Sequence, residues 1–144
     1  MRKRHFLRTS CKFSLKKSFK NVKGSNQTPF KVGDNMKFII NNRLWNVKFV
    51  SAASSNLRRS DGSLTVGVTD GNDNCVYLSD LLSGEFLKKV LCHELCHCFM
   101  MSYNISIPIE QEEFLADWIS IYGEDLIYLL DDLMSTMSRE VQYG

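Results

Sequence analysis

The chain has 144 residues, of which 44% are hydrophobic and 24% charged, and this length predicts one domain. The composition excludes collagen-like, wholly disordered and disulfide-scaffold proteins. The net charge of +2 combines two unlike segments. Residues 1–33 carry ten Lys or Arg and no Asp or Glu, whereas residues 34–144 carry eight basic and all 16 acidic residues. The sequence therefore predicts a basic arm at 1–35 and an acidic folded body at 36–140.

Several interpretations of the basic arm remain open. Its charge and sparse apolar residues are typical of a disordered tail. Like charges interspersed with phenylalanines also suit a nucleic-acid contact, and a basic, serine-containing, acid-free segment resembles an organelle transit peptide. Because a strand is predicted to begin at Met36, the arm could instead be a non-native extension of the reading frame. No segment approaches the ~18 apolar residues of a membrane span, so no membrane partner is expected.

The five cysteines are irregularly spaced and odd in number, which argues against a disulfide framework. Buried thiols acting as small hydrophobic residues are the simplest interpretation, and they predict a reducing, cytoplasmic location. A structural zinc site built from Cys92, Cys96 and Cys98 with nearby histidines is the competing interpretation. Cys92 and Cys98 project about 120° apart around one predicted helix, so that helix does not bring both to a tetrahedral centre.

The body begins with predicted strands. Four segments are rich in aromatic and β-branched residues or lie between strong turn signals: 36–40, 43–50, 63–69 and 75–78. Asn41-Asn42 tolerates the positive φ of a two-residue hairpin turn. Polar residues 51–61 predict a loop, and residues 70–74 (DGNDN) predict a turn.

Helical periodicity follows the strands. Residues 83–103 contain no helix breaker, and their apolar side chains cover nearly the whole circumference, which predicts a buried central helix. A second helix is predicted over 109–122, with Gly123 as its C-terminal cap, and a third over 124–137. Strands followed by helices favour an α+β fold, with a small antiparallel or mixed sheet packed on the central helix and two further helices.

The predicted central helix contains His93-Glu94-Leu95-Cys96-His97, an H-E-x-x-H motif. Residues four apart share a helical face, so both imidazoles can bind one metal at about 2.0–2.1 Å from each nitrogen. Glu94 is rotated by about 100° from His93, where it can act as a general base toward water at the metal. Burying these three polar side chains without partners would cost several kcal/mol, which favours a shared metal site.

A catalytic zinc needs a third protein ligand and one open position. Glu113 and Asp117 lie one turn apart on the next predicted helix. Glu113 is the candidate third ligand, and Asp117 is a candidate to orient a ligating histidine. Favourable charge at a helix N-terminus explains the neighbouring Glu110 and Glu112.

The motif and the segment Glu113-Phe114-Leu115-Ala116-Asp117 together resemble the small gluzincin metallopeptidases, H-E-x-x-H followed by E-x-x-A-[ND], and in particular the ImmA/IrrE-like metallopeptidases of phages and mobile elements. The resemblance covers about residues 63–137. It implies a zinc-dependent endopeptidase, often acting on a repressor, with His93, His97 and Glu113 as ligands and Glu94 as general base. It also implies that Cys75–Leu78 is the sheet edge that pairs with an extended peptide.

The body has no third histidine to stabilise an oxyanion. Tyr77, Tyr103 and Tyr122 are the candidates for that role, and the sequence does not choose among them. A non-catalytic regulatory module with a structural zinc site is the alternative hypothesis. Zn²⁺ is the expected metal in both cases. The expected partner is a protein or peptide substrate, with nucleic acid a further candidate at the basic arm.

Overall fold

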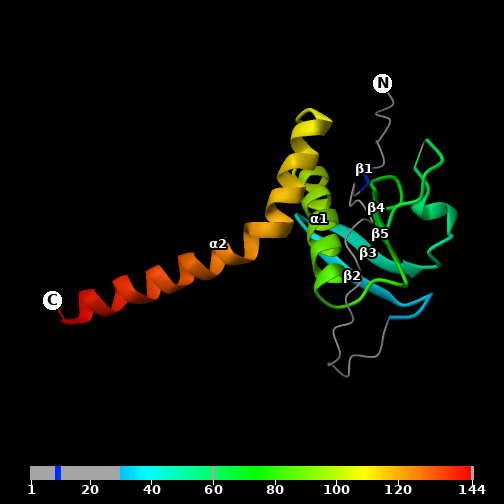
Figure 1. Ribbon diagram of the computed structural model, residues 1–144. Helices are drawn as coiled ribbons and strands as arrows, with labels where there is room; N and C mark the ends of the chain where they lie inside the picture. The colour runs from blue at the N-terminus through cyan, green and yellow to red at the C-terminus, as the bar shows by residue number, and fades with distance from the viewer. Residues whose placement is uncertain (1–8, 11–29, 60, 144) are drawn as a thin grey trace.

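The computed structural model describes residues 9–10, 30–59 and 61–143, and it has the predicted α+β architecture. Helix α1 (Gly84–Ser102) covers one face of a mixed sheet, and the first half of helix α2 (Ile109–Tyr143) lies alongside α1 (Figure 1). The central position predicted for α1 is therefore confirmed. Its burial is less complete than predicted, because Lys88, Lys89 and Phe99 are exposed.

The described strands form one sheet in the order β1-β4-β5-β3-β2. Their bounds are β1 Thr9–Ser10, β2 Asn35–Ile40, β3 Arg43–Val50, β4 Gly67–Asp70 and β5 Cys75–Ser79. β3 pairs with β5 in parallel, and the other neighbours are antiparallel. The predicted edge at Cys75–Leu78 is wrong, because the chain leaves β3 through the 3₁₀ helix η1 (Ser55–Leu57), forms β4, and returns as β5 between β4 and β3.

The β2–β3 hairpin forms as predicted. Asn41 and Asn42 have φ values of 48° and 62°, and Ile40 pairs with Arg43 across the turn. Two successive positive φ values give a turn whose twist matches the flanking strands. The predicted strand 63–69 is shorter in the structure and begins at Gly67. Ser63 donates from its backbone N and its hydroxyl to Asp61 Oδ1, at 2.9 and 2.6 Å, so the chain is still turning there.

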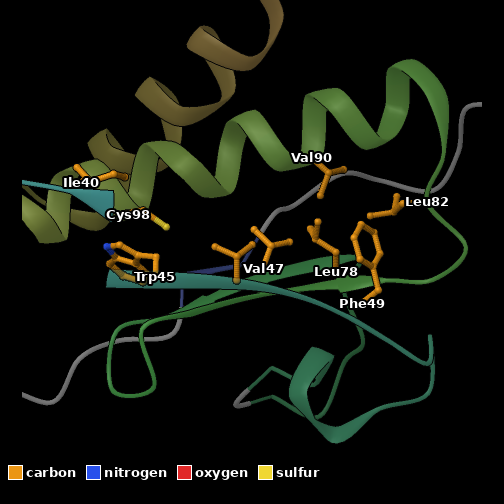
Figure 2. Packing of buried hydrophobic residues seen from close by; sticks show 9 residues of the cluster. Ile40, Trp45, Val47, Phe49, Leu78, Leu82, Val90 and Cys98 are labelled. Atoms are coloured by element: carbon orange, nitrogen blue, oxygen red, sulfur yellow. The ribbon is translucent and has the colours of Figure 1, made fainter. Parts of the chain in front are cut away.

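The main core lies between the sheet and α1 (Figure 2). Alternate residues of β3 point into it, namely Trp45, Val47 and Phe49, each at most 4% exposed. Val90 and Cys98 meet them from α1. Trp45 Nε1 also donates to Ser102 Oγ at 2.8 Å, which ties the end of α1 to the sheet. The orientation of α1 over the strands is thereby fixed at both of its halves.

The predicted helix end at Gly123 is wrong, because α2 continues as one helix from Ile109 to Tyr143. The described residues therefore contain two α-helices rather than three. A glycine inside a helix costs about 1 kcal/mol relative to alanine, which does not end a helix that has good helix formers on both sides. Glu124, directly after Gly123, pairs with Lys88 of α1 and holds this part of α2 against its neighbour.

Of the predicted arm, only Thr9–Ser10 and residues from 30 onward are described. Thr9 pairs with Thr69 and Ser10 with Val68, so this part of the arm belongs to the sheet, contrary to a wholly disordered tail. The other predictions for the arm, and Cys11, lie outside the described residues. Neither described α-helix has a stretch that is both long and apolar enough to cross a bilayer.

Candidate metal centre

The helical spacing of α1 divides its polar side chains between two faces. Glu94 follows Val90 by four residues and faces the sheet, where its Oε2 accepts a hydrogen bond from Thr69 Oγ1 at 2.7 Å. His93 and His97 face α2 and meet the carboxylate of Glu113. All three α1 side chains are fully buried. The H-E-x-x-H motif thus places its base on the strand side and its imidazoles on the helix side.

Three donor groups converge on one point. His93 Nε2 lies 3.1 Å from His97 Nε2, and the two oxygens of Glu113 lie 3.2 Å from His93 Nε2 and 3.4 Å from His97 Nε2. Two ligands bound 2.0–2.1 Å from a tetrahedral zinc are separated by about 3.3 Å. The three separations are close to that edge length, with a different oxygen of Glu113 facing each histidine, and with one atom taken from each residue the donor atoms all lie within 4.8 Å of one another. His93, His97 and Glu113 are also the described residues whose donor atoms cluster closely enough to hold a metal ion.

Carboxylates also face the outer ring nitrogens of both histidines. Glu112 Oε1 lies 2.6 Å from His97 Nδ1, and Asp117 Oδ1 lies 2.8 Å from His93 Nδ1. A carboxylate hydrogen-bonded to Nδ1, as Glu112 is to His97, favours the tautomer that carries its proton there and leaves the Nε2 lone pair free. At 3.1 Å the two Nε2 atoms either share a proton or share a cation. The donor set therefore fits a divalent metal that binds imidazole and carboxylate ligands, such as zinc.

The electrostatic field at the cluster favours positive charge. Burial by itself lowers the pKa of His93, but Glu113, Glu94 and Asp117 outweigh it, so the net shift of the pKa is upward. The same carboxylates favour a bound cation over an empty pair of neutral rings.

Glu94 is buried with one oxygen satisfied and one open. Oε2 accepts from Thr69, whereas Oε1 has no hydrogen-bond partner among the described residues. Burial raises the pKa of Glu94 above its usual range. A buried carboxylate oxygen without a donor is costly unless a ligand or water completes it. Oε1 is therefore the atom at this site that is available for proton transfer.

Strand β4 passes directly beside Glu94. An ideal Cβ built on Gly67 would lie 2.8 Å from Val90 Cγ1 and 3.1 Å from Glu94 Oε1. Only glycine allows the backbone to approach α1 this closely. β4 is therefore the strand nearest the proposed base, and β1, which pairs with it, is the edge strand on this side of the sheet.

The sequence identified most of this arrangement and missed two residues. His93, His97 and Glu113 come together as predicted, and Asp117 lies at His93. Glu112, assigned to helix N-terminal charge alone, faces His97 Nδ1. The sequence signal for Glu112 was its position next to Glu113. Because α1 and α2 run antiparallel to each other, neighbouring carboxylates of α2 can reach different sides of one histidine. Thr69 carried no sequence signal, since its role depends on where β4 lies.

The three candidate tyrosines have other partners. The hydroxyl of Tyr77 donates to Asp73 Oδ2 at 3.1 Å, and its ring packs with Leu57 in the smaller core cluster. Tyr103 stacks on Phe99, and Tyr122 contacts Trp118. The described residues show no contact between these tyrosines and the histidine cluster.

The cysteines lie outside the metal cluster. Cys98 belongs to the core against the sheet, and Cys92 Sγ lies 4.0 Å from the carbonyl oxygen of Ile119. Burial raises the pKa of Cys96 to about 11 and moves the pKa of Cys98 in the same direction, so both are neutral thiols. The four described cysteines are free, in agreement with their predicted packing role.

Comparison of this chain with protein-family models, curated proteins and solved structures found no match.

Proposed function

We propose that this protein is a zinc-dependent endopeptidase of the ImmA/IrrE-like type, a hydrolase that cleaves a peptide bond of a protein substrate. The observation that carries the proposal is the spacing of 3.1 to 3.4 Å among the donor atoms of His93, His97 and Glu113. The outer carboxylates of Glu112 and Asp117 support it, because metal-binding histidines are commonly oriented in this way.

Each residue of the site has a distinct role in the proposed reaction. His93, His97 and Glu113 would hold the zinc, which when bound supplies Lewis-acid polarisation of the peptide carbonyl and activation of water. Glu94 Oε1 accepts the proton of the attacking water and later donates it to the leaving amine nitrogen. Thr69 holds the other oxygen of Glu94, which leaves Oε1 without a hydrogen-bond partner among the described residues and available for this proton.

The β4 edge supports a peptide as the substrate. β1 pairs antiparallel with β4 through Thr9 and Ser10, so this side of β4 accepts an extended segment, and a substrate strand would take the place of β1 there. Gly67 brings β4 against Glu94. A substrate strand that replaced β1 beside β4 would run past the general base. The side chains of Glu113 and Asp117 are 17% and 49% exposed, so these carboxylates reach solvent on the α2 side while the two imidazoles are buried.

Glu94→Gln tests the proposal, and Glu85→Gln is its matched control because Glu85 is an exposed residue of the same helix. With a mixed library of unstructured peptides, the Glu94 variant should retain about one zinc per chain and lose about 10²- to 10⁴-fold in cleavage. The Glu85 variant should match the wild type. Equal cleavage by the Glu94 variant would refute the role of the base.

The regulatory-module alternative predicts a closed zinc site. Burial of both imidazoles is the observation that favours it. Replacing the zinc with Co²⁺ and adding acetohydroxamate discriminates the two functions by absorption spectroscopy. A spectral shift on addition is expected for an open catalytic site, whereas an unchanged spectrum together with no cleavage would favour the module.

A further inference from the structure

The C-terminal half of α2 carries an apolar surface that no other described residue covers. We call it the α2 stripe, and its six residues are each 47–55% exposed: Leu126, Ile127, Leu130, Leu133, Met134 and Met137. Figure 1 shows this half of the helix extending away from the sheet and α1. The stripe is therefore separate from the metal centre, and its role does not depend on the proposed function.

The stripe has the spacing of a helix–helix seam. Leu126, Leu130, Leu133 and Met137 follow one another at intervals of four, three and four residues, which is the a/d pattern of a heptad. Ile127 and Met134 broaden the seam on one side. The acidic side chains of Glu124, Asp131 and Asp132 fall at positions on the other side of the helix, and Asp125 lies at the margin of the seam. Two copies of the seam can therefore meet with these like charges at the edge of the contact or outside it.

A helix of this kind needs a partner. Most helical stability in proteins comes from packing an apolar face against another surface, and the stripe packs against no other described residue. Side chains of this size expose roughly 100 Å² each at half exposure, so the six stripe residues offer roughly 600 Å², and the neighbouring Trp118, Tyr122 and Leu129 add roughly 300 Å². A standard interface uses about 800 Å² from each partner. The exposed apolar area is therefore sufficient for a stable dimer.

A hollow at the base of the stripe extends the same surface. It has a volume of about 350 Å³ and is lined by Trp118, Tyr122, Asp125, Leu126 and Leu129 of α2. Its lining is almost entirely apolar, so an apolar side chain from a partner helix would fit it.

We propose that the α2 stripe is the interface of a homodimer, in which the stripes of two copies pack against each other. The seam is self-complementary, since each copy presents the same apolar positions flanked by acidic ones. A lipid surface fits less well. Helices that lie on membranes carry Lys and Arg on the polar face, whereas residues 124–141 contain one basic residue, Arg139, and five acidic ones.

Leu130→Glu tests this assignment, and Ser135→Glu is the matched control. Leu130 lies on the seam, whereas Ser135 is exposed about 140° away around the helix. Glutamate favours helix at both sites, and neither side chain packs in the cores described above. Sedimentation equilibrium of the full chain, at concentrations on the order of 1 to 100 µM, should show that the wild type is a dimer. Leu130→Glu should weaken it by about 100-fold, while Ser135→Glu should leave it within about threefold.

Each other outcome overturns the proposal. A wild type that stays monomeric over this concentration range would overturn the homodimer. If the monomer then gained helicity only on zwitterionic vesicles, the stripe would be assigned to a lipid surface. A dimer unaffected by Leu130→Glu, or weakened equally by Ser135→Glu, would mean that another surface or general charge repulsion governs association.

Discussion

Thr69→Val removes the hydroxyl that holds the proposed general base while nearly preserving side-chain volume. Thr69 is fully buried, and its Oγ1 lies 2.7 Å from Glu94 Oε2. Because Glu94 Oε1 has no partner among the described residues, the valine variant leaves the buried carboxylate without a side-chain donor. Hydrogen bonds to charged groups contribute about 1.5–3 kcal/mol, and the lost bond should lower the stability by this amount. For a domain of this size the melting temperature should fall by roughly 6–12 °C.

Thr69→Ser is the control, since it retains the hydroxyl and loses only a methyl group, at a cost of about 0.5–1.5 kcal/mol. Calorimetry and peptide-cleavage kinetics should therefore rank the wild type above serine and serine above valine. Zinc content should be the same in all three, because Thr69 is not a ligand. In the valine variant kcat should fall by roughly 10- to 100-fold with little change in KM, since the hydroxyl orients the base rather than the substrate. A valine variant as stable and active as the serine variant would refute this role of Thr69.

Three further predictions concern the site and the β4 edge. Gly67→Ala should destabilise the fold by about 1–3 kcal/mol in denaturant unfolding, because the new Cβ would lie 2.8 Å from buried Val90; an unchanged midpoint would contradict this contact. Glu112→Ala should lower the zinc affinity by about 10- to 100-fold, and Glu113→Ala should lower it further, as measured by metal titration. The reverse order would assign the third ligand to Glu112 instead of Glu113. Ser10→Pro should speed hydrogen exchange at β4 and Ser10→Ala should not, because proline is poorly accommodated in a paired strand; equal exchange in the two variants would remove β1 from the sheet.

The features of the fold that depend on a few neighbouring residues were predicted correctly from the sequence. Asn41-Asn42 specified the hairpin because both residues tolerate positive φ, and the aromatic and β-branched residues of 43–50 specified a strand there. The spacing of His93 and His97 likewise predicted a shared face of α1. These features depend on backbone geometry within a few residues, so one sequence contains the information.

Features that depend on tertiary placement were predicted less well. The family resemblance implied that Cys75–Leu78 forms the edge, but the crossover from β3 puts β5 in the interior and leaves β4 beside Glu94. The second carboxylate at the histidines, Glu112, depends on how α1 and α2 cross. Gly123 has the residue type of a helix end, yet the helix-forming residues on both sides carry α2 through it.

The central claim is that His93, His97 and Glu113 bind zinc, and metal analysis of the full chain tests it most directly. Purified wild type and His97→Ala, each equilibrated with a small excess of Zn²⁺ and then freed of unbound metal, should be measured by mass spectrometry of the elements. The wild type should carry about one zinc per chain and the variant almost none, since it has lost one of three ligands. A folded wild type without zinc, or a His97→Ala variant that retains as much as the wild type, would contradict the claim.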